Sequence, residues 1–428
     1  GDSVICGGDM CGVGTPQQLS HNIKDSPEDL ERDILVNGLY LNDPAKVRFL
    51  AQHAKSNYVW TVNELKVEWV DGIGMEGGHS HPRSHTTKQG SGAGIVTKQL
   101  ARLQEMGVKP RTRCFVDEIV RDASGRVRGL KVYEGYRFPK FGTGRVKYIE
   151  AKKAVILCHG GFSADVAYRM LQDPKLTDKF QTTNQPGATS ELWREASRIG
   201  ALEVQNDWIQ CTPWNNAIEK GMGVSWSFAQ YVAGEFGVWV TTKGERFVNE
   251  NANRKVRADA ILVEQGKGLR CIAVANLAAG AALAERRPGF VEKCVKDGLV
   301  KQSDTLEAIA SAFGIDAAAL KKTIETYNEG VKAGKDALGK DVSRVKPMTE
   351  GPWLAMEISP RIHHCMGGIV TNLRCEVIDV KTLKPIPGLY AAGEATSGVH
   401  GAVRMGTNAI LDCLVFERVA GQSAVKAA

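Results

Sequence analysis

The stretch GLYAAGEATSGVHGAVRMGTNAI, residues 388–410, contains a short apolar strand, a glycine-rich turn and the start of a final helix near Asn408. Three further glycine pairs, Gly7-Gly8, Gly160-Gly161 and Gly367-Gly368, also stand where a strand is expected to give way to a loop or helix. One such pair is weak evidence, because glycine serves tight turns in proteins of every function. The recurrence of strand, turn and helix along the chain predicts an α/β fold.

Hydrophobic spacing predicts the other elements. Amphipathic helices are expected over 25–35 and 43–65, and strands over 112–118, 127–135 and 153–158. From about 207 aromatic residues and loops follow, with strands expected over 237–240 and 245–250 and helices over 256–265, 304–312 and 316–330. Short strands return over 368–372, 376–380 and 388–394. The simplest layout is a split domain of residues 1–206 and 358–428, with residues 207–357 inserted into it.

Composition excludes several classes of protein. The 428 residues are 43% hydrophobic and 24% charged, which rules out a disordered or collagenous chain. Lys and Arg exceed Asp and Glu by 55 to 48, but the charges are scattered, so anionic small molecules are better partners than nucleic acid. Apolar runs such as 151–161 are too short to cross a bilayer, and no direct membrane insertion is expected. The ten cysteines form no C-x-x-C and no C-x-x-C-H motif, so no haem is expected on this chain.

Several motifs occur in an order that resembles one family. They are VILCHGGF (155–162), TTNQPGA (182–188), GERFVNE (244–250), HHCMGG (363–368) and the block 388–410. Their order and spacing resemble the fumarate reductase and succinate dehydrogenase flavoprotein family. The soluble flavocytochrome c fumarate reductases, and relatives that reduce other unsaturated acids, are the most similar branch. The resemblance covers nearly the whole chain and is compatible with a periplasmic or a cytoplasmic location.

This resemblance implies a Rossmann-like FAD-binding domain split by an inserted α+β clamp domain, the residues 207–357 above. The residues that match the family's flavin contacts are Ser3, Gly7, Gly8, Thr15, Gln17, Val116, Gly160, Gly161, Glu191, His364, Glu394, Asn408, Ala409 and Ile410. In such a fold Glu394 accepts hydrogen bonds from ribityl hydroxyls, and the start of the final helix stabilises the anionic reduced flavin. Asp2 stands where some relatives carry a histidine bonded to FAD, so non-covalent FAD is expected.

The sequence departs from the family at its beginning. Family members open with a strand, a G-x-G-x-x-G turn for the pyrophosphate and an acidic residue for the adenosine ribose, and this sequence starts after them. The similar stretch Gly90–Gly94 follows residues 85–88, which do not read as a buried strand, and is expected to be a loop over the active site. The FAD-binding domain is therefore expected to lack its N-terminal pyrophosphate-binding unit. A second polypeptide or a cleaved N-terminal piece would complete the FAD site.

The family's catalytic residues match this sequence unevenly. Reduction of an alkene needs a hydride on one carbon and a proton on its neighbour, with cationic groups on a carboxylate. Arg254 matches the family's proton donor, and His363 and Arg404 match its clamp on one carboxylate. The remaining residues expected in the substrate pocket are Thr212, Trp214, Trp226, Tyr231 and Thr407. A surface arginine paired with Glu250 or Asp259 is the alternative for Arg254.

The second carboxylate site of the family is not retained. Thr212 replaces the histidine that holds this carboxylate in fumarate, and the family's Thr-Glu pair and relay arginine fall on Ala229, Gln230 and Ala233. Glu235 or Arg257 are candidates for the lost relay. The aromatic residues nearby suit a planar ring, although packing between domains explains them equally well.

These residues predict a flavin-dependent ene-reductase of an unsaturated carboxylate, with an aryl-acrylate-like acid favoured over fumarate itself. The alternatives are a 3-ketosteroid-type flavin dehydrogenase, which GDSVICGG and GTPQQ also resemble, a fumarate reductase flavoprotein subunit, and a non-catalytic scaffold subunit. The family implies a cytochrome or a flavin-carrying protein as electron donor. No metal is expected, because the histidines at 79, 81 and 85 read as a solvated loop without acidic or thiol ligands.

Overall fold

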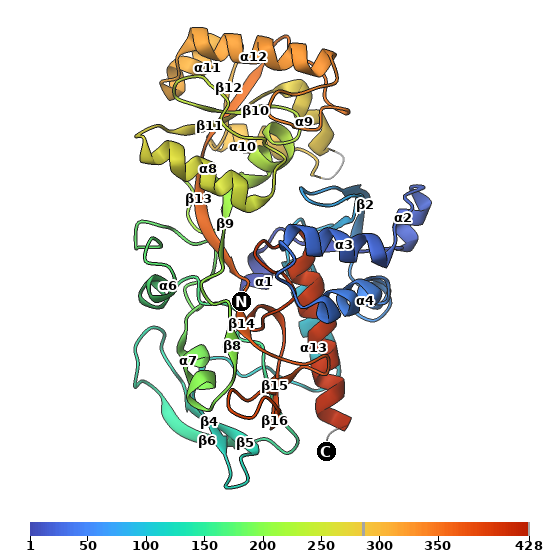
Figure 1. Cartoon of the computed structure of the whole chain (residues 1–428), viewed down its shortest axis with the longest axis vertical. Coiled ribbons are helices and arrows are strands. Elements are labelled where there is room, and N and C mark those ends of the chain that lie inside the picture. Colours follow the sequence, from blue (N-terminus) through green and yellow to red (C-terminus); the bar gives the residue numbers. More distant parts are fainter. Residues whose placement is uncertain (285–286, 427–428) are drawn as a thin grey trace. The chain divides into compact units, whose positions relative to one another are not determined.

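The computed structural model (Figure 1) describes residues 1–284 and 287–426. The chain forms two compact units. Unit 1 comprises Gly1–Lys179, Asn184–Gln210 and His364–Ala428, and unit 2 comprises Phe180–Thr183 and Cys211–His363. None of the helices in the described ranges has both the length and the apolar character that a membrane span requires.

Unit 1 mixes helices with short sheets. Its helices are α1 (Asp2–Ile5), α2 (Pro16–Ser20), α3 (Pro27–Asn37), α4 (Pro44–Asn63), α5 (Ala93–Glu105), α6 (Val166–Gln172), α7 (Glu191–Arg198), the 3-10 turn η2 (Gly393–Ala395) and α13 (Asn408–Lys426). Its strands are β1 (Asp9–Cys11), β2 (Trp69–Gly74), β3 (Ser84–Thr87), β4 (Cys114–Arg121), β5 (Val127–Glu134), β6 (Arg145–Glu150), β7 (Val155–Leu157), β8 (Glu203–Val204), β14 (Gly368–Ile369), β15 (Glu376–Ile378) and β16 (Pro385–Ala391).

A parallel pair of strands in unit 1 positions two of the glycine motifs. β7 runs parallel to β16, with Val155 opposite Leu389 and Leu157 opposite Ala391, and β15 is the antiparallel neighbour of β16. The carboxyl ends of adjacent parallel strands lie at the same edge of a sheet. The segments that leave this edge carry Gly160-Gly161 and Gly393-Glu394, and they are therefore neighbours.

Helix α13 packs against the strands that form this edge. It contacts β16, β7 and α4 (Figure 1), and its residues Leu411, Leu414 and Val415 lie in one buried cluster with Leu50 of α4. α4 begins where Asp43 accepts hydrogen bonds from the Ala45 and Lys46 amides, and Pro44 suits the first helical position. The final helix starts at Asn408, as the sequence predicts.

Three further sheets complete unit 1. β1, β3 and β2 form one antiparallel sheet, β4, β5 and β6 a second, and β8 pairs with β14. The predicted helices at 25–35 and 43–65 are confirmed as α3 and α4, and the predicted strands at 112–118, 127–135 and 153–158 as β4, β5 and β7, with shifted ends. The strand expected over 368–372 is shorter, because β14 covers only Gly368–Ile369.

Unit 2 is built around an antiparallel sheet with the strand order β10, β11, β13, β12, in which β9 also pairs with β13. All six residues of β11 are buried. The elements are β9 (Ile209–Asn216), the π-helix η1 (Phe228–Ala233), β10 (Val238–Thr241), α8 (Arg254–Gly266), β11 (Cys271–Asn276), α9 (Leu277–Ala284), α10 (Phe290–Lys296), β12 (Lys301–Ser303), α11 (Leu306–Phe313), α12 (Ala317–Lys332) and β13 (Trp353–Cys365). β9 and β13 carry the chain between the units.

Two local predictions are wrong. Residues 245–250 form no strand beyond one isolated bridge between Val240 and Arg246, because Arg246 and Glu250 turn inward and bind each other. Residues 85–88 are expected to form no buried strand, but residues 84–87 form the fully buried strand β3. Burial is tolerated here because Asp25 and Asp33 neutralise the guanidinium of Arg83.

Candidate functional site

The edge at β7 and β16 places Glu394 beside the Gly160-Gly161 turn. Gly160 has φ +81, and a Cβ atom at Gly161 would meet the Glu394 carboxylate, so a larger residue is excluded there. The Cys365 amide donates to Glu394 Oε1 at 2.9 Å, and the Trp193 indole donates to the Gly160 carbonyl at 3.0 Å. The structure therefore brings together Gly160, Gly161 and Glu394 of the predicted flavin contacts.

Glu394 lies in an environment that favours its neutral form. Burial is the main cause that raises its pKa to about 8, with smaller increases from Asp2 and Asp412, and Arg404 and the Cys365 amide oppose the rise. The Nδ1 atom of His364 lies 3.6 Å from Glu394 Oε2. At neutral pH a carboxyl with this pKa is largely protonated and is able to donate a hydrogen bond as well as accept one.

The first turn of α13 presents polar atoms that the described protein does not satisfy. Asn408 is fully buried, and both its Oδ1 and Nδ2 atoms lack a hydrogen-bond partner. The neighbouring Thr407 is buried, and the backbone there has φ +64. Backbone N–H groups of Ala409 and Ile410 belong to the first turn of a helix, where they have no acceptor within the helix. This donor set fits the polar edge of a flavin ring and a helix dipole that stabilises negative charge.

Arg404 precedes this turn in unit 1. Its backbone amide donates to Gln210 Oε1 at 2.8 Å, and the Gln210 side-chain amide donates to the Arg404 carbonyl at 3.3 Å. Its Nη1 donates to the Met405 carbonyl at 3.0 Å. These bonds fix the backbone on both sides of a buried guanidinium.

The N-terminal residues of the predicted flavin site pack against the Gly90–Gly94 stretch. Gly8 has φ +77, and a Cβ atom there would lie 2.6 Å from the Ser91 carbonyl oxygen. The Gly92 amide donates to the Cys6 carbonyl at 3.0 Å. Ser3 and Ile410 line one small cavity of about 30 Å³. The stretch itself joins the buried strand β3 to α5, which corrects the expectation that no buried strand precedes it.

The other predicted flavin contacts are spread over unit 1. Thr15 caps α2, and Gln17 is held by the carbonyls of Val70 and Asp71. Val116 lies in β4, and Glu191 is the first residue of α7.

In unit 2 the predicted proton donor lies on an indole ring. Arg254 is the first residue of α8, which Asn253 caps by accepting from the Val256 amide at 3.0 Å. The guanidinium carbon of Arg254 lies 4.7 Å from the centre of the Trp214 ring, and that of Arg257 lies 4.9 Å from the same ring. Arg254 is buried, which overturns the alternative of a surface arginine.

The other expected pocket residues of unit 2 surround Trp214. The ring centres of Trp214 and Trp226 are 6.3 Å apart, and those of Trp226 and Tyr231 are 5.7 Å apart. The Thr212 hydroxyl donates to Asn215 Oδ1 and approaches the Arg361 carbonyl at 3.3 Å. The hydroxyl of Thr183 lies 2.7 Å from His363 Nδ1. Thr212 is thus engaged within the protein, whereas the aromatic rings form one buried cluster.

A buried charged cluster behind α8 was not predicted. Arg246 forms two hydrogen bonds with Glu250 and binds Asp336 at 2.5 Å, and Lys340 lies 3.7 Å from Glu250. Burial lowers the pKa of Lys340 to about 8. The motif GERFVNE held Arg246 and Glu250, but nothing in the sequence paired them with a loop after α12.

Glu250 connects this cluster to the helix that carries Arg254. Its backbone carbonyl accepts a hydrogen bond from Arg257 Nη1 at 2.9 Å, and the same nitrogen donates to Gln230 Oε1 at 2.9 Å. Arg257 therefore contacts the residue that replaces the family's relay glutamate. The cluster fixes the start of α8 and, with it, the position of Arg254.

The histidines at 79, 81 and 85 do not form a solvated loop. His79 and His85 are buried, and His79 Nε2 lies 3.0 Å from the Gly406 carbonyl. Within residues 1–284 and 287–426, only His81, with Asp25 and Asp29, brings atoms close enough together to consider a metal. Asp25 is already bound by two nitrogens of Arg83, which competes with a cation for that carboxylate.

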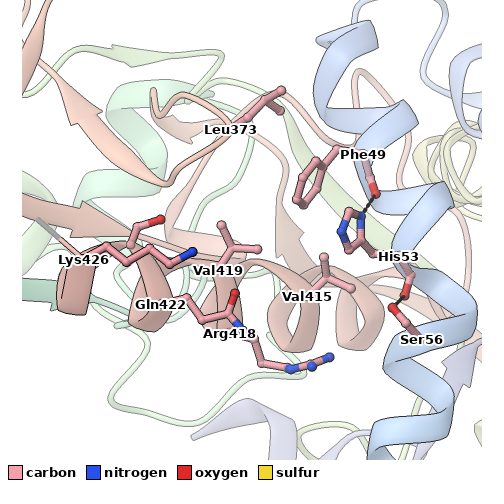
Figure 2. A pocket seen from close by; sticks show the side chains of 10 residues that line it. Phe49, His53, Ser56, Leu373, Val415, Arg418, Val419, Gln422 and Lys426 are labelled. Carbon is pink, nitrogen blue, oxygen red and sulfur yellow. Dashed lines mark hydrogen bonds between the residues drawn. The ribbon is translucent and has the colours of Figure 1, made fainter.

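A separate cavity of about 280 Å³ lies between α4 and α13 (Figure 2). Phe49, Val415 and Val419 supply its apolar wall, while Arg418 and Lys426 supply charge. It contains none of the predicted site residues.

Several known proteins are similar to this chain over nearly all of its length. A family model described as "FAD binding domain" matches residues 1–410. The acrylate reductase flavoprotein subunit of Shewanella woodyi is 35% identical over all of this chain and 84% of its own length. The urocanate reductase of Eggerthella lenta is 31% identical over 99% of this chain and 68% of its own length. A solved flavocytochrome c3 fumarate reductase in its open conformation superposes with a TM-score of 0.77 and 31% identity, over 100% of this chain and 72% of that one.

Proposed function

Since this chain belongs to the FAD-binding flavoprotein family that includes the fumarate, acrylate and urocanate reductases, we propose that it reduces the C=C bond of an unsaturated monocarboxylic acid with a planar substituent. It is an FAD-dependent oxidoreductase. The proposal concerns which acid it takes and which residues act on it.

One observation carries the choice of substrate. The buried Arg254 lies on an indole ring inside an aromatic cluster, and Thr212, at the place of the family's second carboxylate ligand, is bonded to Asn215 and offers no charge. Ala229, Gln230 and Ala233 add none. At these four positions the second carboxylate of fumarate would meet no cationic side chain, whereas an aromatic ring gains from contact with Trp214 and Trp226.

Each residue has a defined task in this proposal. His363 and Arg404 bind the single carboxylate and favour the negative charge that develops on it. Bound FAD, once reduced, supplies the hydride. Arg254 donates a proton from its guanidinium to the neighbouring carbon, so that one hydride and one proton convert the alkene into the saturated acid. An external donor then returns two electrons, and solvent returns two protons, one of them to Arg254.

FAD would be held by unit 1 without a covalent bond. Asn408, Thr407 and the first-turn amides of α13 would face the flavin ring, and Glu394 would bond the ribityl chain. The Asp2 carboxylate accepts hydrogen bonds from the Gln185 amide and the Asn184 side chain, so it serves a structural role. Acid precipitation should leave the flavin in the supernatant, and flavin that stays with the pellet would contradict non-covalent binding.

The relatives include flavocytochromes, and we propose a cytochrome or flavin-carrying protein as the physiological donor. Reduced methyl viologen replaces this donor in the test. Each lost charge-assisted hydrogen bond is worth about 1.5–3 kcal/mol, so two of them predict that kcat/KM for fumarate is about 10² to 10⁴ below that for cinnamate. The two acids are assayed side by side. Equal or faster turnover of fumarate would show that Thr212 and its neighbours have been misinterpreted.

A further inference from the structure

Unit 2 contains a buried hydrogen-bond donor without an acceptor. Trp214 is 1% exposed, and its indole Nε1 has no hydrogen-bond partner among the described residues. An N–H group that leaves water without gaining an acceptor destabilises the folded state, and such groups are rare in native proteins. A bound ligand that supplies a hydrogen-bond acceptor would satisfy this N–H group.

Other indoles of the chain show that the fold satisfies such groups elsewhere. The Nε1 atoms of Trp193 and Trp239 donate to the carbonyls of Gly160 and Ala229 at 3.0 and 3.3 Å. Trp214 therefore differs from equally buried tryptophans in the same chain.

The surroundings of Trp214 connect this donor to the proposed chemistry. The guanidiniums of Arg254 and Arg257 lie 4.7 and 4.9 Å from its ring centre. Arginine side chains and indole rings donate hydrogen bonds and accept none at nitrogen. Thr212, two residues earlier on β9, already donates to Asn215. The group that complements this region is therefore a hydrogen-bond acceptor.

We propose that Trp214 is a specificity-determining residue, and that its indole N–H donates a hydrogen bond to an acceptor atom on the planar substituent of the substrate. This inference rests on the proposed function and narrows it. The preferred substrates are β-substituted acrylates whose ring carries an acceptor such as a ring nitrogen, and plain aryl acrylates are poorer. Sites that bond a substrate atom discriminate against analogues lacking it, because the site's own group is then left unpaired.

The test compares acids of one shape. Cinnamate and the three pyridylacrylates differ only by one ring nitrogen and its position. One pyridyl isomer should exceed cinnamate in kcat/KM by about 3- to 10-fold, the range of one hydrogen bond. Trp214→Phe keeps a ring and removes the N–H, and it should abolish this margin.

Binding of the saturated acids to the oxidised holoenzyme, measured by calorimetry, repeats the comparison without turnover. The matching pyridylpropionate should bind about 3- to 10-fold more tightly than phenylpropionate to the wild type and equally well to Trp214→Phe. This readout is independent of the alkene's reactivity, which a ring nitrogen also changes. Wild-type binding also tests the inference if the variant does not fold.

Trp239→Phe is the matched control, because it removes an indole N–H that already has a protein acceptor. It should keep the margin between the two kinds of ring. The inference is overturned if the wild type prefers no pyridyl isomer, or if the preference persists in Trp214→Phe. If either result is found while cinnamate and the pyridylacrylates are still reduced, the proposed function stands. If fumarate alone is reduced, both the inference and the proposed function are overturned.

Discussion

At the scale of single residues, the decisive arrangement is a cation placed against an aromatic ring away from water. Arg254 is buried, its position on α8 is capped by Asn253, and its guanidinium faces Trp214. A planar guanidinium stacks on a ring and keeps a fixed direction for its N–H groups, which an ammonium does not reproduce.

Arg254→Ala should therefore lower kcat/KM for alkene reduction by about 10² to 10⁴, the usual contribution of a general acid, without weakening FAD binding. Arg254→Lys should be severely impaired as well. Viologen-coupled turnover and flavin titration measure the two effects. Lys255→Ala is the control, because Lys255 is exposed and pairs only with Asp259. Near-native turnover of either Arg254 variant would contradict its role.

Glu394 should make stability depend on pH. Burial raises its folded-state pKa from 4.5 to about 8, so the folded protein keeps a proton that the unfolded chain loses. The stabilisation that the neutral Glu394 contributes is fully present below about pH 4.5. It is lost as the pH rises to about 8, and the free energy of unfolding falls by at most about 1.4 kcal/mol per pH unit. Glu417, whose pKa is raised to about 7, also lowers the free energy of unfolding as the pH rises, but its contribution ends at a lower pH. The charge of Asp412 raises the pKa of both Glu417 and Glu394.

The change between about pH 7 and 8 therefore reports mainly on Glu394. Glu394→Gln, which is neutral at every pH, should flatten the decrease in melting temperature over this window, and Glu417→Gln should not. Thermal unfolding of the apoprotein at a series of pH values measures both. An unchanged slope in Glu394→Gln would contradict the pKa assigned to Glu394.

At the scale of elements, the start of α13 concentrates groups that lack partners. Asn408→Ala removes two buried polar atoms that nothing in the described protein satisfies. The apoprotein should thus lose no stability, while FAD affinity should fall about tenfold or more if the amide bonds the flavin. Fluorescence titration and apoprotein melting give the two values. A destabilised apoprotein with unchanged FAD affinity would assign Asn408 to the fold instead.

The same scale shows which elements a single sequence predicts. α3 and α4 carry side-chain caps, and α3, α4 and α13 all bury apolar faces that depend on nearby residues, so each was predicted with shifted ends at most. β3 was missed because its burial depends on Asp25 and Asp33 meeting Arg83 from a distant segment. The strand over 245–250 failed for the same reason, since Asp336 holds Arg246 from a loop beyond α12.

The candidate site follows this pattern. Residues quoted from motifs, such as Gly161, Glu394 and Asn408, lie in contact or in unsatisfied positions that fit a cofactor. The orphaned indole of Trp214 and the bonds of Arg257 to Gln230 and Glu250 depend on tertiary contacts. No local pattern in the sequence predicts whether a given indole has found an acceptor.

At the scale of the whole molecule, the two units divide the predicted residues by task. All of the predicted FAD contacts belong to unit 1, together with Arg404, whereas Arg254, His363 and the aromatic cluster belong to unit 2. Under the proposed function, the unit that would hold the cofactor would contribute one carboxylate ligand, and the inserted unit would contribute the acid and the residues that select the substrate. Changes of substrate preference are therefore expected to arise from substitutions in unit 2.

The insertion of unit 2 between β7 and β16 also dictates an order of events during synthesis. Val155 emerges from the ribosome long before its parallel partner Leu389, and all of β10, β11 and β13 emerges in between. All strands of the antiparallel sheet of unit 2 are synthesised before β16. The parallel pair of β7 and β16 can form only after nearly the last segment of the chain has emerged. The edge proposed to bind the flavin is consequently assembled late, and a chain stalled before β16 would have a folded unit 2 inserted in an incompletely folded unit 1.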